Sequence, residues 1–547
     1  MPEHARMGGG DPLMRSLIAA FVLLGLCGCG AAPRSAIPPQ RVLGEFALAE
    51  PDAAANEVAA GLAVEVAVRG LTYPTSLEIG DEGEMYLAEA GAVPGDAGAR
   101  ARVLRIARNG STTVVADRLA PPVTDLLWHG GRLFISHRGT ISVLEAGVVR
   151  EVVGGLPSQG DHQNNQLAAG PDGYLYVGQG TATNAGVVGP DNVWLPQQRS
   201  VRDVPAKAVV LRDLAFVASD PADGATAKTG AFQPFATASG AITVPGAIKA
   251  NGAILRFKPD GSGLEAYAWG LRNPCGLQWT PEGRLYASDD GFDERGSRPI
   301  ANAPDVVWDI RRDAWYGWPD YAGGDPVIDR HFRPTAGVQP DSLLKDHPPV
   351  APPVLRLEAH RGVAKLGGSP AGFSPDGTLL LARFGALAPP VGDEQSPTGR
   401  DVLVIDPRDG GSRIFLRARR ESLGSGEFAH TSGPGLKRPV DVVWDARDQV
   451  VYVVDLGAVA TSAGAEPRPF PGSGVVWRVK RIGARTSFPP DIRLGGEHTP
   501  MATRPGMMGS ASGGEPLAPS ERPLDESDRL PLEVLPAHPV QTARPGP

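Results

Sequence analysis

The chain has 547 residues, 41% of them hydrophobic and 21% charged, so it is long enough to bury a large core. Its 70 glycines and 54 prolines indicate many turns and short strands rather than long helices. The formal net charge is -8, and acidic and basic residues are mixed along the chain, which excludes a basic track for nucleic acid.

The N-terminus has the pattern of a signal peptide. Met14-Arg15 precedes the apolar run Leu17 to Leu26, which is too short to span a bilayer and ends at small residues. Leu26-Cys27-Gly28-Cys29 also resembles a lipobox, and Cys29 fits the acylated position because Cys27 follows the bulky Leu26. We therefore expect export and a lipid anchor at Cys29 on a bacterial membrane, facing the periplasm or the cell exterior. A plain secretory peptide with incidental cysteines is the alternative.

One phrase recurs six times along the chain: a turn with Gly or Asp, followed by an alternating apolar strand. The copies lie at residues 81–87, 130–135, 171–177, 281–286, 375–381 and 447–453. An Asp-Gly turn before a period-2 strand is a hairpin signal, because Gly readily adopts positive φ. A strand is also predicted before each copy, at residues 74–77, 122–126, 164–167, 273–277, 369–373 and 438–442.

Three or four strands per unit, repeated six times, predict an all-β fold, a six-bladed β-propeller with loop insertions and a disordered C-terminal tail. A β-sandwich would not predict the same phrase six times. We divide the chain into a lipoprotein signal peptide (1–28), a tether (29–60), the propeller (61–483, with an insertion at about 184–250) and the tail (484–547). The insertion has little strand pattern, and the tail is rich in Pro, Gly, Ser and Met without periodicity.

The loops that lead into the innermost strands of a propeller meet at one mouth of its channel, and three of them are polar in this chain. They are Gly160–Gln166, Leu271–Pro274 and Lys437–Pro439. His162 can act as a general base near neutral pH, although a His in a polar loop is commonly just solvated. Arg272 and Arg438 suit an anionic ligand with carboxylates, unless either arginine pairs with an Asp of a neighbouring blade.

An acidic, glycine-containing loop, Ser288–Gly296, follows the fourth-blade strand. Clustered carboxylates and carbonyls suit a hard cation such as Ca²⁺, but the spacing is not that of an EF-hand. Acidic loops are commonly solvated without a metal, so this pattern alone leaves both interpretations open.

Together these segments resemble the glucose/sorbosone dehydrogenase family, six-bladed propellers that use pyrroloquinoline quinone (PQQ) and calcium. The resemblance covers roughly residues 65–480. Its most specific parts are Gly160-Asp161-His162-Gln163, the segment Gly270–Leu277, and Tyr316-Gly317-Trp318-Pro319, in that order. The chain is more similar to the sorbosone-dehydrogenase-like branch than to the soluble glucose dehydrogenases.

The resemblance implies that His162 takes the proton of a sugar hydroxyl while hydride passes to the quinone. It implies that Asp161 orients His162 and helps to bind substrate, and that Arg272 stabilises negative charge on the reduced quinone. It also implies a set of cofactor-binding residues: Asn273, Arg438, Arg383 and Asp290 for PQQ, and the backbone carbonyls of Gly291 and Phe292 for Ca²⁺.

Three positions depart from the pattern of the soluble glucose dehydrogenases. Gln166 stands where they have Arg, Phe292 replaces a Pro in the metal loop, and Val440 occupies the position of a second quinone-binding Arg. The activity implied is PQQ-dependent oxidation of an aldose-type sugar or a related aldehyde, with an external electron acceptor. The alternatives are a non-catalytic propeller lipoprotein that binds a glycan or protein partner, and a metal-dependent lactonase-type propeller, which would need carboxylates converging from several blades.

Overall fold

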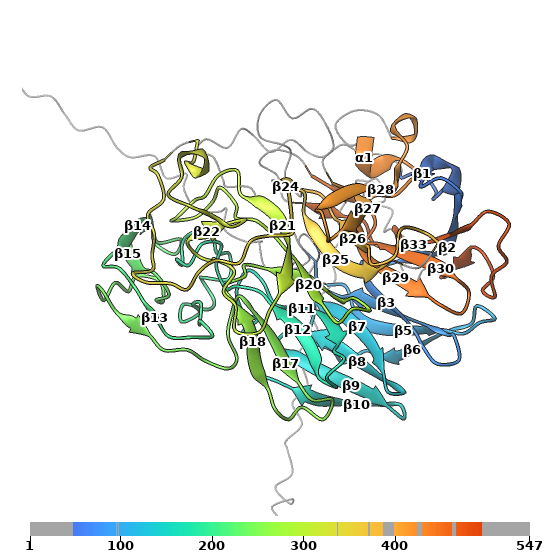
Figure 1. The fold of residues 1–547 in the computed structure, drawn as a ribbon, viewed down its shortest axis with the longest axis horizontal. Coiled ribbons are helices and arrows are strands. Elements are labelled where there is room, and N and C mark those ends of the chain that lie inside the picture. The colour runs from blue at the N-terminus through green and yellow to red at the C-terminus, as the bar shows by residue number, and fades with distance from the viewer. Residues whose placement is uncertain are drawn as a thin grey trace, which may run out of the picture. The chain divides into compact units, whose positions relative to one another are not determined.

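The computed structural model describes residues 48–494, except 94–95, 97, 336, 370–371, 387–398, 424–428 and 462–466. Within these residues, strands form six sheets of four or five strands each (Figure 1). Helical structure in the same residues comprises α1 (Ala429–Ser432) and three short 3₁₀ turns, Ala53–Ala55, Arg330–Phe332 and Arg420–Ser422. The predicted signal peptide, the lipidation at Cys29, residues 29–47 of the tether and residues 495–547 of the tail lie outside the described residues.

Each large sheet is one blade, and its strands follow one another outward from the first. The first blade is β3 (Pro74–Ile79), β4 (Met85–Ala90), β5 (Ala101–Ile106) and β6 (Thr112–Ala116). The second is β7 (Val123–His129), β8 (Arg132–His137), β9 (Thr140–Glu145) and β10 (Val148–Val153). The third is β11 (Asn164–Ala169), β12 (Leu175–Gln179), β17 (Ala253–Phe257) and β18 (Glu265–Trp269).

The other three blades complete the set. The fourth is β19 (Pro274–Trp279), β20 (Leu285–Asp289), β21 (Pro304–Ile310) and β24 (Leu355–Ala359). The fifth is β25 (Val363–Gly368), β26 (Leu379–Arg383), β27 (Asp401–Asp406), β28 (Gly411–Ala418) and β1 (Asn56–Val58). The sixth is β29 (Pro439–Asp445), β30 (Val450–Asp455), β33 (Gly474–Arg481), β2 (Leu62–Leu71) and β34 (Ile492–Arg493).

The first strands of the six blades form a closed ring. β3 packs on β7, β7 on β11, β11 on β19, β19 on β25, β25 on β29, and β29 returns to β3. The predicted six-bladed propeller is therefore confirmed. The ring is closed by the N-terminal strand β2, which pairs antiparallel with β33 in the last blade.

The predicted propeller boundaries are too narrow at both ends. β1, inside the expected tether, pairs with β28 of the fifth blade. β34, inside the expected tail, pairs in parallel with β2. Both short strands add hydrogen bonds to the outer edge of a blade, which protects an otherwise open sheet edge.

The recurring phrase forms the turn between the first and second strands of each blade. In the first copy, Gly83 has φ 80° and its N–H donates to Gly80 O at 2.8 Å. Gly283 in the fourth copy has φ 76° and donates to Thr280 O at 2.9 Å. The sixth copy keeps this left-handed conformation with a non-glycine residue, Gln449, at φ 52°. The turn thus demands positive φ, which explains why Gly fills the position in the other copies.

The first strands lie at the predicted positions in five blades, but not in the fifth. There, the sequence predicts a strand at residues 369–373, whereas β25 ends at Gly368 and Gly372 lies in a turn. The apolar alternation of β25 is interrupted by Lys365 and ends in two glycines, so the sequence pattern does not reveal it.

Every first strand has a β-bulge or register irregularity near its start, and polar side chains from several of these sites meet at the propeller axis. Lys365 Nζ donates to Thr75 O at 2.9 Å and forms ion pairs with Asp125 and Asp441. Gln166 spans three blades, since its Oε1 accepts from Leu277 N at 2.8 Å and its Nε2 donates to Leu366 O at 3.0 Å. The departure at Gln166 therefore has a structural role between blades.

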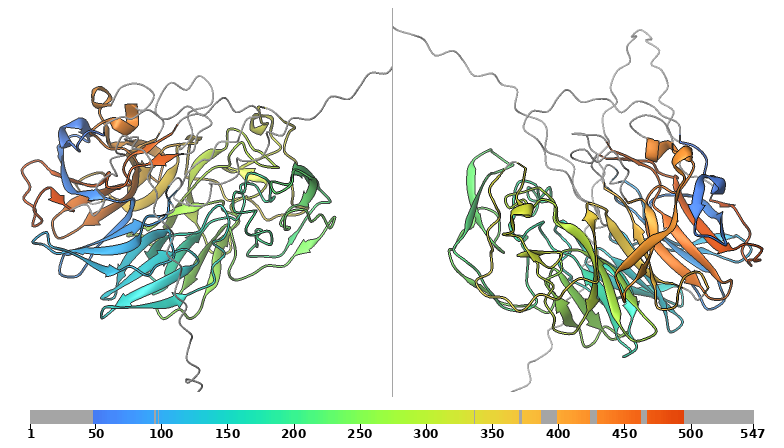
Figure 2. Two further views of the ribbon diagram at one scale, coloured as in Figure 1. Left: turned by 180° about the vertical axis from the view of Figure 1, so that it is seen from behind. Right: turned by 45° about the horizontal axis from the view of Figure 1, so that its top comes forward.

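Two insertions, in the third and fourth blades, pack on each other. The third-blade insertion contains the pairs β13 (Val209–Val210) with β16 (Thr243–Val244) and β14 (Ala215–Ser219) with β15 (Thr226–Gly230), where the sequence predicts little strand. The fourth-blade insertion contains β22 (Tyr321–Ala322) and β23 (Asp325–Pro326). Phe232 and Trp318 join them, with ring centroids 5.5 Å apart. Both views in Figure 2 show the insertions to one side of the blades. A further short pair, β31 (Val459–Ala460) with β32 (Arg468–Pro469), lies in the sixth blade.

Candidate active site

His162 lies in the loop before β11 and is 5% exposed. Its Nδ1 lies 3.0 Å from Thr181 O, and because a carbonyl only accepts, Nδ1 carries the hydrogen. Nε2 is then the basic nitrogen, and it has no hydrogen bond within the described residues. Burial and the charge of Arg272 lower the pKa of His162 to about 3, so the ring is neutral near neutral pH. The neutral imidazole is the form that can accept a proton.

Asp161 does not orient His162 as expected, because its carboxylate is bound elsewhere. It accepts from Trp194 Nε1 at 2.8 Å and Asn192 Nδ2 at 3.0 Å, and it pairs with Arg295 at 2.8 Å. Burial alone would raise the pKa of Asp161, but Arg295 holds it below its ordinary value. Thr181 therefore sets the orientation of the ring, and Asp161 anchors the loop to the insertion.

Arg272 is 3% exposed and is fixed by the insertion and by the acidic loop. Its Nη2 donates to Asp293 Oδ2 at 2.9 Å and to Asn184 Oδ1 at 3.0 Å. Asn184 Oδ1 also accepts from Asp293 N, and Asn184 O accepts from Trp318 Nε1 at 3.2 Å. Arg272 thus pairs with an Asp of its own blade, not with one of a neighbouring blade as the alternative supposed. Trp318, in the segment that the resemblance singles out, donates to Asn184 and so supports the same group of contacts.

Asp289 holds the backbone of the fourth-blade loop. It accepts from Asn273 N at 2.7 Å, from Arg272 N at 3.2 Å and from Trp308 Nε1 at 3.1 Å. Burial raises the pKa of Asp289 to about 6, while these donors favour its charged form. An aspartate at the end of the second strand and a tryptophan on the third strand thus fix the loop that carries Arg272.

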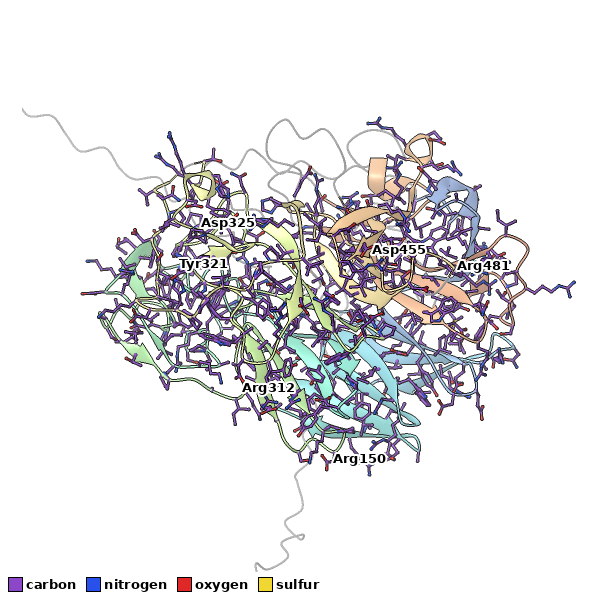
Figure 3. All side chains as sticks on the ribbon, in the orientation of Figure 1. Arg150, Arg312, Tyr321, Asp325, Asp455 and Arg481 are labelled. Atoms are coloured by element: carbon purple, nitrogen blue, oxygen red, sulfur yellow. The ribbon has the colours of Figure 1, made fainter. Side chains whose placement is uncertain are left out.

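The sixth blade repeats this arrangement. Asp455 accepts from Lys437 N and Arg438 N, both at 2.8 Å, and from Trp477 Nε1 at 3.1 Å. Asp455 lies among the strands of this part of the molecule (Figure 3). In both loops predicted to carry functional arginines, the backbone N–H groups are therefore bound by an aspartate that also accepts from a tryptophan. The sequence pattern does not reveal this arrangement.

Asn273 contacts the loop that carries His162, and Asp290 is bound to Asn273. Asn273 Nδ2 donates to Asp290 Oδ2 at 3.0 Å, and Asn273 Oδ1 accepts from Asn165 Nδ2 at 2.9 Å. Burial and Asp305 raise the pKa of Asp290 well above its ordinary value. A Cβ at Gly180 would lie 2.4 Å from His162 Cβ and 2.7 Å from Asn273 Oδ1. Only glycine allows this close approach of His162 and Asn273.

The predicted metal loop runs beside these groups. Gly291 N donates to Asp305 Oδ1 at 2.9 Å, whereas Asp305 Oδ2 is buried without a hydrogen-bond partner among the described residues. The Phe292 side chain is 3% exposed and packs in the core shared with the insertions. The described residues contain no group of three or more His, Cys, Asp or Glu side chains arranged to hold a metal. A cation at this loop would depend on backbone carbonyls, as the resemblance implies for Gly291 and Phe292.

Arg438 is 1% exposed and contacts only main-chain acceptors among the described residues. It donates to Phe384 O at 3.3 Å, and to Gly385 O and Ala386 O at 3.2 Å, above the Phe384 ring. Unlike Arg272, it has no ion pair with an acidic side chain in this part of the chain. Its charge is thus uncompensated by a bonded carboxylate.

Arg383, also predicted to hold the cofactor, is committed to another group. Its guanidinium forms two parallel hydrogen bonds with Asp401, at 2.7 and 2.6 Å. Val440, at the position of the family's second arginine, is buried in the core cluster that includes Phe384. The structure therefore favours Arg438 over Arg383 as a cation for a carboxylate.

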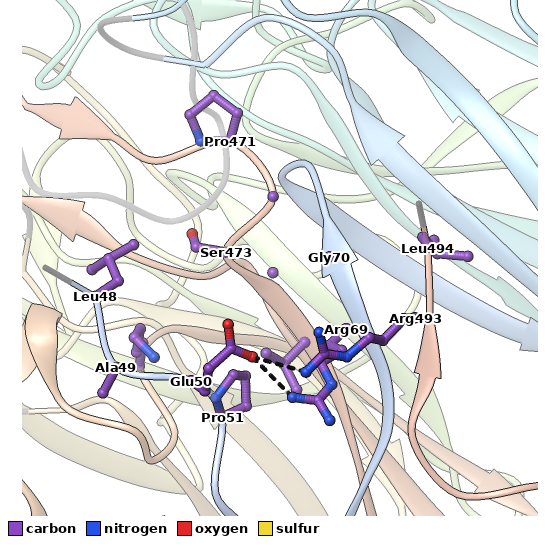
Figure 4. A pocket seen from close by; sticks show the side chains of 14 residues that line it. Leu48, Ala49, Glu50, Pro51, Arg69, Gly70, Pro471, Ser473, Arg493 and Leu494 are labelled. Atoms are coloured by element: carbon purple, nitrogen blue, oxygen red, sulfur yellow. Dashed lines mark hydrogen bonds and ion pairs between the residues drawn. The ribbon is translucent and has the colours of Figure 1, made fainter. Parts of the chain in front are cut away.

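A cavity of about 280 Å³ lies beside the sixth blade, but it is not part of this site (Figure 4). Its lining includes Lys437, Glu50, Arg69 and Arg493. Glu50 pairs with Arg69 at 2.9 Å and with Arg493 at 3.4 Å. Glu50 is thus shared by two arginines, and none of the catalytic candidates lines this cavity.

No protein-family model matches the chain. Over 175 residues, the chain is 27% identical to quinoprotein glucose dehydrogenase B of Acinetobacter calcoaceticus. This match covers 32% of the chain and 29% of that protein, so it spans less than a third of the curated relative.

Solved structures with a similar arrangement include the holo PQQ domain of a pyranose dehydrogenase from Coprinopsis cinerea. Its TM-score is 0.47 at 16% identity, covering 78% of this chain and 97% of that chain. The PQQ-bound aldose sugar dehydrogenase from Streptomyces coelicolor has a TM-score of 0.42 at 16% identity, covering 78% of this chain and 100% of that chain. At TM-scores below 0.5, the fold assignment rests on the six sheets of this chain itself.

The sequence match falls on a protein of the kind that the motifs predicted. The resemblance of this propeller to glucose/sorbosone dehydrogenases is therefore confirmed in sequence by its similarity to a quinoprotein glucose dehydrogenase.

Proposed function

We propose that this chain is a PQQ-dependent dehydrogenase that oxidises an aldose-type sugar or a related aldehyde and passes the electrons to an external acceptor. The observation that carries the proposal is the state of His162. Its Nδ1 donates to Thr181 O, so the lone pair is on Nε2, in a residue close to Arg272 and Asn273. This is the arrangement that a general base for a hydroxyl proton requires.

The residues present fit a planar anion such as PQQ. Arg438 is buried, positively charged and without an acidic partner among the described residues, which suits a carboxylate of the cofactor. Asn273 and Asp290 supply polar groups at the fourth blade, which one blade separates from the sixth. Carbonyls of Gly291 and Phe292 would hold Ca²⁺, a cation that prefers oxygen ligands. When bound, the quinone would supply the hydride acceptor that no protein side chain can provide.

The side chains of this protein would carry out the proton transfer and the stabilisation of charge. His162 Nε2 takes the proton of the substrate hydroxyl, and Thr181 keeps the ring in the required tautomer. Arg272, held by Asp293 and Asn184, places a fixed positive charge next to the reacting groups. Because its partners are already in position, this charge needs no rearrangement during the reaction.

The structure gives no support to the lactonase-type alternative. Such an enzyme needs carboxylates from several blades to converge on a metal, and Asp125 and Asp441 do converge at the axis. Lys365 Nζ, however, is bound between them and forms an ion pair with each. The carboxylates at the axis are thus paired within the protein.

We further propose that the chain is exported and anchored through a lipid on Cys29, as its N-terminal pattern suggests. Among the described residues, no helix has the length and hydrophobicity that crossing a membrane requires. Mass spectrometry of the membrane fraction would detect a diacylglyceryl group on Cys29, and Cys29→Ala should release the protein from the membrane. Unmodified Cys29 in membrane-bound protein would refute the anchor.

The activity is tested with the full chain, PQQ, CaCl₂ and a panel of aldoses, by following reduction of an electron-accepting dye. His162→Asn should lower kcat about 100-fold or more, the scale of general-base catalysis, while PQQ binding persists. The matched control is His331→Asn, because His331 is exposed and outside the site. If the wild-type chain neither binds PQQ nor reduces the dye with any aldose, the proposal is wrong.

A further inference from the structure

Arg400 is a second arginine without an acidic partner at the site, and no family motif points to it. It immediately precedes β27, and its side chain is partly buried. The neighbouring carboxylate, Asp401, is fully engaged by Arg383. Within the described residues, the Arg400 guanidinium makes no hydrogen bond and no ion pair. A partly buried charged group without a partner is available to a ligand.

Arg400 lies next to Arg438. Its backbone N–H donates to Arg383 O at 2.8 Å, and the Arg438 guanidinium donates to the carbonyls of the two following residues, Phe384 and Gly385. Burial and the charge of Arg400 hold the pKa of Arg438 well below its ordinary value. Two like charges are thus brought together at the end of one strand, β26, without a bonded carboxylate.

Two buried arginines of this region differ from Arg400 and Arg438, because each has an acidic partner. Arg272 pairs with Asp293, and Arg298 pairs with Asp320, each at 2.9 Å. Asp455, the acid whose charge acts on both Arg400 and Arg438, is occupied by backbone N–H groups and the Trp477 indole. Its charge therefore offsets only part of the positive charge, and an anion from outside the chain would complete the balance.

The backbone at Arg400 supports the same conclusion. Its φ of 67° lies in the left-handed region, which costs a non-glycine residue about 1–3 kcal/mol. Such strain persists where the surrounding structure enforces it, and it is concentrated at ligand sites. Glycine would relieve it, so an unpaired arginine at this position has no structural benefit in the contacts described.

We propose that Arg400 and Arg438 together bind a carboxylate of the cofactor. Arg400 would supply the second guanidinium, which is missing because Val440 stands at the position of the second arginine. The proposal rests on the proposed function only for the identity of the ligand. Two guanidiniums around one carboxylate give short, charge-assisted hydrogen bonds with defined geometry. Arg400 would thereby compensate for the departure of this chain from the family pattern at Val440.

The test measures ligand affinity by calorimetry on the full chain, without turnover. The probes are PQQ with CaCl₂, and trimesate, an aromatic tricarboxylate that has no quinone. Arg400→Gln should weaken PQQ binding about 10- to 100-fold, the loss of one charge-assisted hydrogen bond. Arg400→Lys should recover part of the affinity. Arg413→Gln is the matched control, because Arg413 is exposed on β28 of the same blade, and it should bind PQQ like the wild type.

The outcomes separate the two proposals. If the wild type binds PQQ and Arg400→Gln binds it equally well, with an unchanged urea-unfolding midpoint, the role of Arg400 is refuted. If the wild type does not bind PQQ, the dehydrogenase proposal fails and trimesate decides the question. Weaker trimesate binding by Arg400→Gln than by the wild type supports a carboxylate site, and equal or absent binding in both overturns it.

Discussion

Replacing Lys365 with Met should destabilise the fold severely, because Lys365 is the cation at the propeller axis. Its side chain is 4% exposed and faces Asp125, Asp441 and the carbonyl of Thr75. Removing one partner of a buried ion pair costs about 3–5 kcal/mol, since the other charge stays buried and uncompensated. The orphaned Thr75 carbonyl adds about 1–3 kcal/mol, although the two losses are not strictly additive. We expect a total loss of at least about 3 kcal/mol.

The assay is urea unfolding of the full chain, followed by tryptophan fluorescence. Lys207→Met is the matched control: Lys207 pairs with Asp313, but the two side chains are 52% and 60% exposed, so its loss should stay within about 0.5 kcal/mol. A loss below about 1 kcal/mol for Lys365→Met, with unchanged m-value, would refute the reasoning.

The pH dependence of the same variant provides a second check. Burial raises the pKa of Asp125 to about 6, and Lys365 opposes this rise. A carboxyl whose folded pKa exceeds its unfolded pKa stabilises the fold when protonated, and this stabilisation is lost as pH rises through the folded pKa. Without Lys365 the folded pKa should rise further, so the deficit of the variant relative to the wild type should shrink between pH 8 and pH 5.

Three further predictions follow from other sites. Because the pKa of His162 is about 3, the pH profile of kcat/KM should show no inflection from this ring between pH 8 and 5. An inflection near pH 6.5 that disappears in His162→Asn would contradict this prediction. Gly283→Ala should lower the free energy of unfolding by about 1–2 kcal/mol, because Gly283 has φ 76° and an added Cβ would meet no atom within 4 Å. Gln449→Gly should not lower it. Equal losses in the two variants would argue against a conformational origin. Asp455→Asn should lower stability by about 1–3 kcal/mol and weaken PQQ binding, and an unchanged dissociation constant would show that Asp455 does not position Arg438.

The repeat makes most of the scaffold predictable, because a turn that demands positive φ and a period-2 strand are both local signals. β25 escapes prediction because Lys365, which belongs to the axial network, breaks its apolar pattern. The hairpins of β13 to β16 escape it because strands of two to five residues with exposed edges carry almost no periodicity. Local sequence patterns thus predict the strands that face an apolar core. They do not predict the strands whose position depends on polar contacts.

The functional site is predictable only in part. His162, Arg272 and Asn273 stand out as polar residues where apolar strands should begin, and the structure brings them together. Thr181 and Asn184 act through contacts distant in sequence, although the polar run directly after β12 is a usable signal. Arg400 is invisible in the sequence, since an unpaired charge can be recognised only once the partners of its neighbours are known.

The pairing of β2 with β33 also bears on how the chain reaches its folded state. The closing strands lie near opposite ends of the propeller sequence, from Leu62–Leu71 to Gly474–Arg481. The ring therefore cannot close during synthesis until the chain has been made past Arg481, and contacts over such sequence separations form slowly. Until then the sixth blade lacks an outer strand and the two end blades expose unpaired faces. A nascent chain of this kind therefore stays incompletely folded for nearly the whole of its synthesis.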